Sequence, residues 1–436
     1  MFDWLRWLQS KWARFQGVGY GTLLGLLTVG FYGVYLAPRC WKYTYVTWDA
    51  IRDIITTQHL LAGGAIWADP VVTGYYPWYP PLHALGCAGL IALWDLDVFS
   101  FYALTPALLN LWLVPAWILI LRRLTQVSHP AAFWGTLSLT AMPWIVTHVI
   151  AYPTVMAHAV PFAAWLFWGY LWLQNHAPAG LGWKWAAFAA ILGLLGLYHP
   201  PTFLIVLGTL SLHLLLGGTE TGWRRWRMWA TLAGISLAVC APYWLPNLLQ
   251  PIRNPAPLAY LAPGLTRWEM ILPGTTLGRS LPFIFFIGLG LAVCWQNRRE
   301  SSCRWVWALL LITILGQIPA YTKLALEAYA PSWHAAMGNQ IPIVLPHEFQ
   351  LYFQLTLTLF LGMGLLLFIR WKTWLYPTVY YTLWTWFLFS LLLSLKELPT
   401  HSQVFVWPYR LEGTYTALVE AIQTQTTVTD GICAPN

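Results

Sequence analysis

The sequence contains few charged residues. Only 9% of its 436 positions are Asp, Glu, Lys or Arg, whereas 58% are hydrophobic and the mean hydropathy is +0.56. A soluble domain carries charge at roughly a quarter or more of its positions. This shortage excludes an ordinary soluble surface and indicates a polytopic membrane protein.

Cysteine is also scarce, with six positions in the whole chain. These six show no metal-binding spacing among themselves. Cys40 and Cys433 would both lie outside the membrane and could pair, but Cys87 and Cys240 fall in apolar segments. The cysteines therefore predict no disulfide framework.

Long runs without a charged side chain predict about eleven membrane helices, since each span needs about 20 apolar residues. If Arg6, Lys11 and Arg14 are cytoplasmic, alternating spans return most of the 23 basic residues to the inner side and most of the 15 acidic residues to the outer side. The basic residues flank spans and form no stripe, so the net charge of +8 predicts no nucleic-acid partner. The predicted fold is all-α.

Two parts of the chain depart from simple crossing helices. The apolar segment Pro81 to Trp94 is too short to span the bilayer and predicts an interfacial or re-entrant helix of the first outer loop, 38–97. The run 185–219 must hold two short helices, with a turn at Tyr198-His199-Pro200-Pro201. The expected domains are a transmembrane domain at 1–395 and a short external C-terminal tail at 396–436.

The first outer loop collects polar chemistry. It carries Asp49, Asp53, Asp69, Asp95 and Asp97, a third of all acidic residues, between two charge-free stretches. A transporter would instead place ionisable residues within its spans along a substrate path. The loop is therefore the expected place of a functional site.

The motifs of this loop, behind a single span, resemble those of the GT-C superfamily of integral-membrane glycosyltransferases, such as protein O-mannosyltransferases and lipid A aminoarabinose transferases. They are Trp48-Asp49, the segment 58–64, Asp69-Pro70, Tyr75-Tyr76-Pro77 and Tyr79-Pro80-Pro81-Leu82. The segment 104–124 and the turn at 198–201 are also similar. The chain departs from the family at Ala50, at Tyr79 in place of a Lys, and at His347-Glu348 in place of a late Arg.

The resemblance implies an inverting, polyprenyl-phosphate-sugar-dependent glycosyltransferase in the bacterial inner membrane, with its site facing outward. Its partners would be this donor, membrane lipids, and an unidentified lipid, glycan or protein acceptor. Asp49 matches the family's catalytic acidic residue and would act as the base that takes the acceptor's proton. The phosphate leaves without a general acid. The resemblance implies no particular cofactor and leaves a divalent metal open. Candidate substrate-binding residues are Arg52, Asp53, Asp69, Tyr75, Tyr76, Tyr79, His158, His199, Arg279, His347 and Glu348.

These residues also have simpler interpretations. On a helix from Trp48 to Leu61, Asp49, Arg52 and Asp53 would share one face as a surface ion-pair cluster. Asp69 precedes proline, which is typical of turns, and the aromatic run 75–79 could anchor the loop at the interface. His158 is expected in a short loop, as an ordinary polar residue, and Arg279 as a snorkelling cation. The alternative function is a noncatalytic membrane-complex subunit or a lipid-handling transporter of the same fold.

Overall fold

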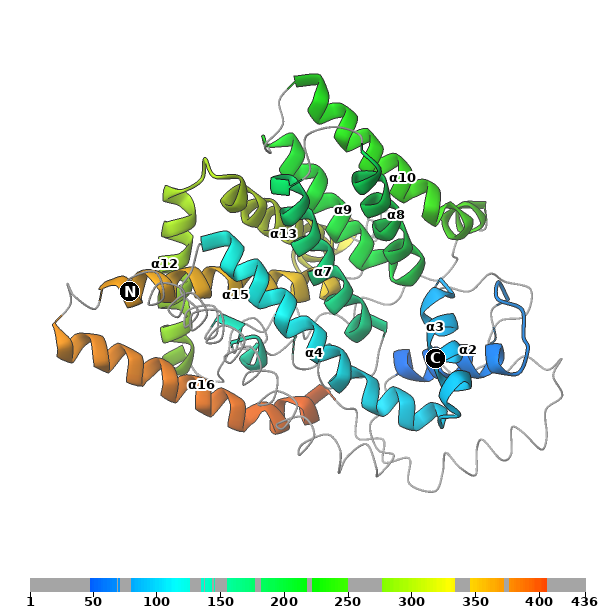
Figure 1. The fold of residues 1–436 in the computed structure, drawn as a ribbon. Helices are drawn as coiled ribbons and strands as arrows, with labels where there is room; N and C mark the ends of the chain where they lie inside the picture. Colours follow the sequence, from blue (N-terminus) through cyan, green and yellow to red (C-terminus); the bar gives the residue numbers. More distant parts are fainter. Residues whose placement is uncertain are drawn as a thin grey trace, which may run out of the picture.

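The computed structural model describes residues 48–68, 70, 80–125, 135–136, 138–142, 145, 155–176, 182–217, 222–249, 277–333, 346–371 and 376–405. All regular structure in these ranges is helical, which confirms the predicted all-α class. Figure 1 shows α2 and α3 together at one side of the protein, beside the start of α4, while α12, α15 and α16 lie at the opposite side. The predicted first span, at 17–37, lies outside these ranges.

The two helices of the first outer loop are short, and local sequence sets their ends. Helix α2 (Trp48–Leu61) has the bounds expected from the sequence and stops before Gly63, which adopts a left-handed φ of 83°. Helix α3 (Leu82–Trp94) follows two prolines and ends at Asp95, also left-handed. Its 13 residues rise about 20 Å, which is less than the roughly 30 Å of a bilayer core.

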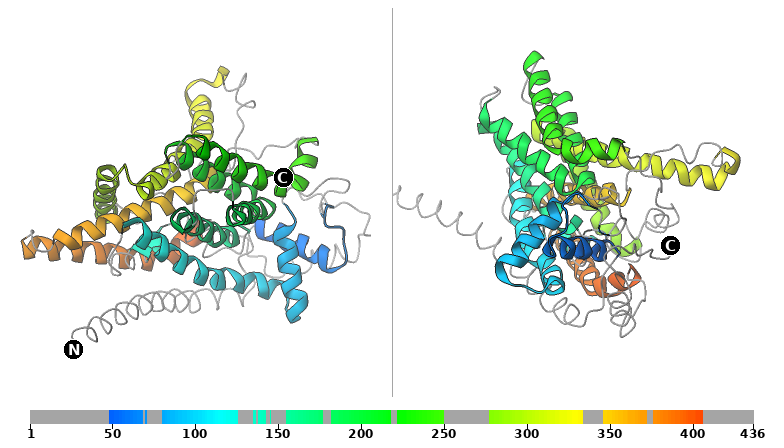
Figure 2. Two further views of the ribbon diagram at one scale, coloured as in Figure 1. Left: turned by 45° about the horizontal axis from the view of Figure 1, so that its top comes forward. Right: turned by 90° about the vertical axis from the view of Figure 1, so that its right-hand side faces the viewer.

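Helix α3 has a buried face. His83, Ala84, Cys87, Ala88 and Ile91 are buried, and their spacing of three to four residues places them along one side of the helix. This side packs against α2 and α8, and the start of α4 (Val98–Thr125) lies close to α2. The views in Figure 2 keep α2, α3 and the start of α4 next to one another. Helices α2 and α3 are therefore docked on the bundle.

The run 185–219 forms two helices, as predicted. Helices α8 (Trp183–Tyr198) and α9 (Pro200–Leu215) each have 16 residues and are separated by His199 alone. His199 is extended, with φ −154° and ψ 96°, because the proline that follows disfavours helical backbone at the preceding residue. The break positions the buried His199 imidazole between the two helices.

Several helices suit a membrane by length and composition. In the described part of the chain, three segments are long and apolar enough to cross: Gly222–Leu245, Ser301–Pro319 and Glu348–Ile369. They belong to α10 (Gly222–Leu249), α13 (Ser301–Tyr329) and α15 (Pro346–Arg370). The remaining long helices are α7 (Val155–His176), α12 (Leu277–Gln296) and α16 (Pro377–Phe405), and α16 continues past the expected domain boundary at 395.

Helices α12 and α15 share the most extensive helix–helix interface among the described elements. Glycine makes their approach possible: a Cβ on Gly290 would lie 1.8 Å from the carbonyl oxygen of Phe360, and one on Gly364 would lie 1.9 Å from that of Phe286. Small residues at membrane-helix contacts allow backbones to meet in this way. Helices α12 and α15 are therefore closely packed, and the first turn of α15 carries Glu348.

Candidate functional site

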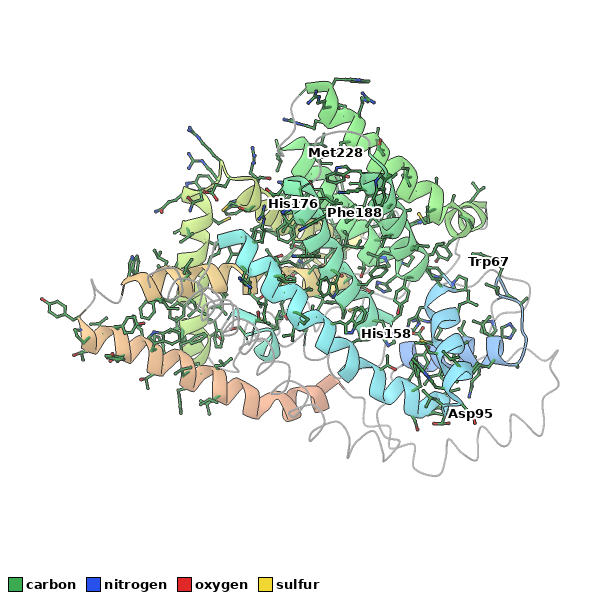
Figure 3. The ribbon with its side chains drawn as sticks, in the orientation of Figure 1. Trp67, Asp95, His158, His176, Phe188 and Met228 are labelled. Atoms are coloured by element: carbon green, nitrogen blue, oxygen red, sulfur yellow. The ribbon has the colours of Figure 1, made fainter. Side chains whose placement is uncertain are left out.

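Buried polar side chains from six parts of the fold gather where α2 and α3 meet the bundle. We call these residues the polar cluster, and they come from α2, α3, α4, α7, the α8–α9 break and α15. Its members are Asp53, His83, Cys87, Tyr102, His158, His199 and Glu348, all buried. Figure 3 shows His158 at the end of α7 that faces the α2–α3 pair. In a chain with so little charge, this concentration of polar groups marks the candidate site.

Asp53 ties α2 to α7. Its Oδ1 accepts hydrogen bonds from Nε and Nη2 of Arg52, at 3.0 and 2.8 Å, and its Oδ2 accepts one from the backbone N–H of Val155 at 3.1 Å. Val155 begins α7, whose first N–H groups have no partner within the helix. A carboxylate there also interacts favourably with the helix dipole. Asp53 therefore caps α7 from a distant part of the sequence.

The Arg52–Asp53 contact differs from the surface ion-pair cluster that helical spacing suggested. Asp53 pairs with its sequence neighbour, and its side chain is only 6% exposed, against 25% for Arg52. The backbone of Asp53 is held as well: its carbonyl accepts a hydrogen bond from the Tyr102 hydroxyl at 3.2 Å, and that hydroxyl lies 2.8 Å from Thr57 Oγ1. These bonds fix α2 against α4.

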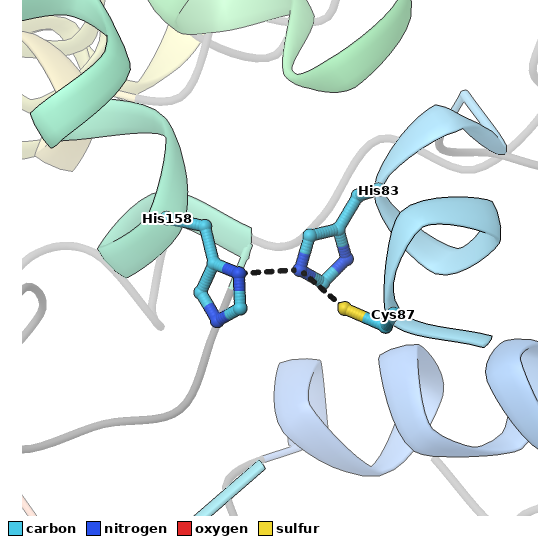
Figure 4. A group of neighbouring side chains, drawn as sticks. All are labelled: His83, Cys87 and His158. Atoms are coloured by element: carbon cyan, nitrogen blue, oxygen red, sulfur yellow. Dashed lines mark hydrogen bonds between the residues drawn. The ribbon is translucent and has the colours of Figure 1, made fainter. Parts of the chain in front are cut away.

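His83, Cys87 and His158 form a compact trio, drawn in Figure 4. His83 Nε2 lies 3.2 Å from His158 Nδ1 and 3.6 Å from Cys87 Sγ. The imidazole planes of the two histidines are nearly perpendicular, with ring centroids 4.6 Å apart. One nitrogen of each ring and the sulfur all lie within 4.8 Å of one another, so these atoms could share a metal ion.

Burial sets the protonation of the trio's two α3 members. It lowers the pKa of His83 well below its ordinary value, and the charges of His158, Arg52 and His199 lower it further. Burial raises the pKa of the Cys87 thiol to about 12, against the opposing effect of a hydrogen bond with Tyr102. At neutral pH, His83 is therefore an uncharged imidazole with a lone pair on one ring nitrogen.

The opposite end of the cluster is formed by His199 and Glu348. His199 Nε2 lies 3.3 Å from Glu348 Oε1, and His199 Nδ1 lies 2.8 Å from Thr202 Oγ1. Thr202 in turn accepts a hydrogen bond from Tyr352 at 3.3 Å. The α8–α9 break is thus joined to the first two turns of α15.

The structure brings together some of the predicted site residues. Arg52, Asp53, His158, His199 and Glu348 meet in or beside the polar cluster. Asp49 lies in the first turn of α2, Arg279 at the start of α12 and His347 at the start of α15, but their side chains are outside the described part. Asp69, Tyr75, Tyr76 and Tyr79 also lie outside the described residues.

Two expectations need correction. His158 is the fourth residue of α7 and does not lie in a loop, because this helix already begins at Val155. The metal-binding potential of Cys87 was missed because cysteines were compared only with one another. Its partner His83 is four residues earlier, a spacing that places both side chains on one helix face.

The arrangement defines a class of fold, an all-α polytopic membrane protein. Its fold is similar to that of ArnT from Cupriavidus metallidurans. The apo ArnT crystal structure matches with a TM-score of 0.54 and 15% identity, over 84% of this chain and 62% of ArnT. ArnT bound to undecaprenyl phosphate matches with a TM-score of 0.49 and 16% identity, over 80% and 60% respectively. No family model and no curated protein matches the sequence.

Proposed function

We propose that the protein is an inverting glycosyltransferase that moves a sugar from a polyprenyl-phosphate donor to a lipid, glycan or protein acceptor. The observation that carries this proposal is the position of the polar cluster, where the first outer-loop helices dock on an apolar bundle of GT-C type. A donor with a long isoprenoid tail stays in the bilayer, so its transferase needs polar groups beside the membrane helices. The charge partition favours the outer face of a bacterial inner membrane.

The reaction balances with a single base. The acceptor hydroxyl oxygen attacks the anomeric carbon and forms the new glycosidic bond, while the bond from that carbon to the phosphate oxygen breaks. Polyprenyl phosphate leaves with the bonding electrons, and the hydroxyl proton passes to a carboxylate. We assign this carboxylate to Asp49, by its match to the family motif and its place on α2.

The contacts of Asp53 support Asp49, and not Asp53, as the base. Both of its carboxylate oxygens are engaged, one by Arg52 and the other by Val155, and the side chain is buried. These contacts tie the carboxylate to Arg52 and to the start of α7. Asp53 therefore acts in the proposal as a positioning residue for α2 and Arg52.

Arg52 is the proposed partner of the donor phosphate. Its side chain is 25% exposed, and Asp53 holds its guanidinium in a fixed orientation. A guanidinium binds phosphate with short, charge-assisted hydrogen bonds, and a side chain that is already ordered loses less entropy on binding. Arg279 and His347 stay candidates for the same role, whereas His199 is engaged by Glu348 and Thr202 and would act indirectly.

The direct test is transfer by the purified protein in lipid nanodiscs. A panel of radiolabelled polyprenyl-phosphate sugars would be incubated with membrane lipids, glycans and protein acceptors, with counts followed in the donor and product fractions. Transfer with release of polyprenyl phosphate and inverted anomeric configuration is expected. Donor binding without turnover across the panel would contradict the enzyme and support the noncatalytic subunit. Movement of intact donor between vesicle leaflets would support the lipid-handling transporter.

A further inference from the structure

We propose that His83, Cys87 and His158 bind a Zn²⁺ ion that joins helix α3 of the first outer loop to the start of α7. The inference rests on the trio's geometry and donor chemistry, and is independent of the transferase reaction. The GT-C resemblance leaves a divalent metal open and gives His158 only as a substrate-binding candidate, so the assignment of these three ligands comes from the structure.

Two of the trio's three spacings agree with tetrahedral coordination. With Zn–N bonds of about 2.0–2.1 Å and Zn–S bonds of about 2.3 Å, two nitrogen ligands lie about 3.3 Å apart and a nitrogen and a sulfur about 3.6 Å apart. The structure has 3.2 Å between His83 Nε2 and His158 Nδ1, and 3.6 Å between His83 Nε2 and Cys87 Sγ. The remaining pair, His158 and Cys87, lies within 4.8 Å and would have to approach to about 3.6 Å when the ion binds.

The donor atoms select the metal. Two imidazole nitrogens and one thiolate suit zinc and related transition metals, whereas Mg²⁺ and Ca²⁺ prefer oxygen ligands. His83 and Cys87 are four residues apart on one face of α3, the spacing by which a helix offers two ligands to one ion. Three protein ligands leave a fourth position for water or another small ligand.

A hydrogen-bonded arrangement of the trio is the alternative to a bound metal. His83 Nε2 carries either one proton or one lone pair, so it can donate to His158 Nδ1 while the Cys87 thiol bonds to Tyr102. Zinc would instead take a lone pair from each ring nitrogen and from the Cys87 thiolate, and the thiol proton would be released to solvent.

Zinc coordination would strengthen the attachment of helix α3, which has few contacts with the bundle. Helix α3 packs mainly on α2 and, through a smaller contact, on α8. The His83–His158 contact is its polar link to α7. A metal site at this point fixes the outer-loop helices to the bundle and so keeps α2, with Asp49 and Arg52, in place. Zinc therefore acts here as a structural link beside the candidate site.

The experiment measures zinc in the full-length protein, purified in detergent with an affinity tag that lacks histidine. Inductively coupled plasma mass spectrometry should find about one Zn²⁺ per chain, as expected of a single structural site. The variants Cys87→Ala and His158→Gln should lose most of this zinc. Cys240→Ala and His213→Gln are matched controls, since both residues are buried elsewhere in the bundle, and should retain it.

A second readout begins with the wild-type protein, so its first result does not depend on the folding of a variant. Replacing zinc with Co²⁺ in the wild type should give tetrahedral d–d bands and a thiolate-to-metal charge-transfer band, and this last band should vanish in Cys87→Ala. Wild-type protein that holds no zinc after zinc addition would overturn the proposal, as would a cobalt spectrum without the thiolate band. Equal zinc in Cys87→Ala and wild type would do the same. None of these outcomes depends on sugar transfer.

Discussion

His199 and Glu348 meet at 3.3 Å inside the protein, where each side chain is only 1% exposed. The contact joins the proline-induced break between α8 and α9 to the first turn of α15. Further contacts orient the imidazole: Thr202 Oγ1 lies 2.8 Å from the other ring nitrogen of His199, and the Tyr352 hydroxyl donates a hydrogen bond to Thr202. The network sets the position of two helices whose sequences lie far apart.

The His199–Glu348 pair should therefore show energetic coupling. Replacing either residue by glutamine, as His199→Gln or Glu348→Gln, leaves a buried polar partner and should lower the free energy of unfolding by about 1.5–3 kcal/mol. The double variant should lose less than the sum, with a coupling energy of about 1 kcal/mol or more. Equilibrium unfolding in detergent measures all three. His176→Gln, at an exposed position of α7, should change little, and strict additivity would refute the coupling.

Asp53 should stabilise the fold more strongly than an ordinary helix cap. Asp53→Ala removes the hydrogen bond to Val155 N–H and the pairing with Arg52, in a buried place. The free energy of unfolding should fall by about 2–4 kcal/mol, because a charge-assisted hydrogen bond is lost and Arg52 is left without its carboxylate partner. Hydrogen exchange at the start of α7 should rise at the same time.

The matched control for this change is Asp97→Ala. Asp97 accepts a hydrogen bond from the Ser100 backbone N–H at 2.8 Å and thus caps α4, but it is exposed to solvent. Its loss should cost about 1 kcal/mol, the usual value of an exposed N-cap. Equal destabilisation by the two substitutions would show that burial and the Arg52 pair add nothing.

Local sequence predicted the features that depend on local physics. The bounds of α2 and the break at His199 followed from helical spacing and from the effect of proline on its preceding residue. The all-α class followed from hydropathy. These signals act within one or two helical turns, so a single sequence suffices to read them.

The assembly of the site could not be predicted in the same way. His83 and Cys87 belong to an apolar segment, and their partner His158 lies 75 residues after His83 in the chain. Helical spacing leaves Asp53 open between a substrate-binding residue and a surface ion pair, since spacing alone does not say which face of α2 is covered. In both cases the deciding contact is tertiary, and it depends on how α2 and α3 dock on α7.

Two glycines of α12 should respond in opposite ways to the same substitution. In Gly290→Ala the new Cβ would meet the Phe360 carbonyl, so α12 and α15 must separate and stability should fall by about 1–3 kcal/mol or more. In Gly288→Ala nothing lies within 4 Å of the Cβ, and alanine should stabilise the helix by about 0.5–1 kcal/mol. Thermal unfolding of both variants tests this; a stable Gly290→Ala protein would show that the two helices are not in direct backbone contact.

The charge partition predicts which side of the membrane each end of α4 faces. In a background with Cys40 and Cys433 replaced by serine, a cysteine at Asp97 should react with a membrane-impermeant maleimide in intact cells. A cysteine at Arg123, near the other end of α4, should react only after the cells are permeabilised. Labelling of position 97 only from the inner side would place the polar cluster on the cytoplasmic face and reverse the proposed topology.

The proposed base is tested by Asp49→Asn, with Asp95→Asn as its control. Asparagine keeps the size of Asp49 and much of its hydrogen bonding but cannot take the acceptor's proton, so kcat should fall by about 10²-fold or more while donor binding persists. Asp95 is exposed and left-handed at the end of α3, with φ 47°. Asparagine adopts this backbone readily, so Asp95→Asn should leave both folding and turnover nearly unchanged. Radiolabel transfer under saturating donor separates the two variants, and wild-type turnover by Asp49→Asn would remove Asp49 from the mechanism.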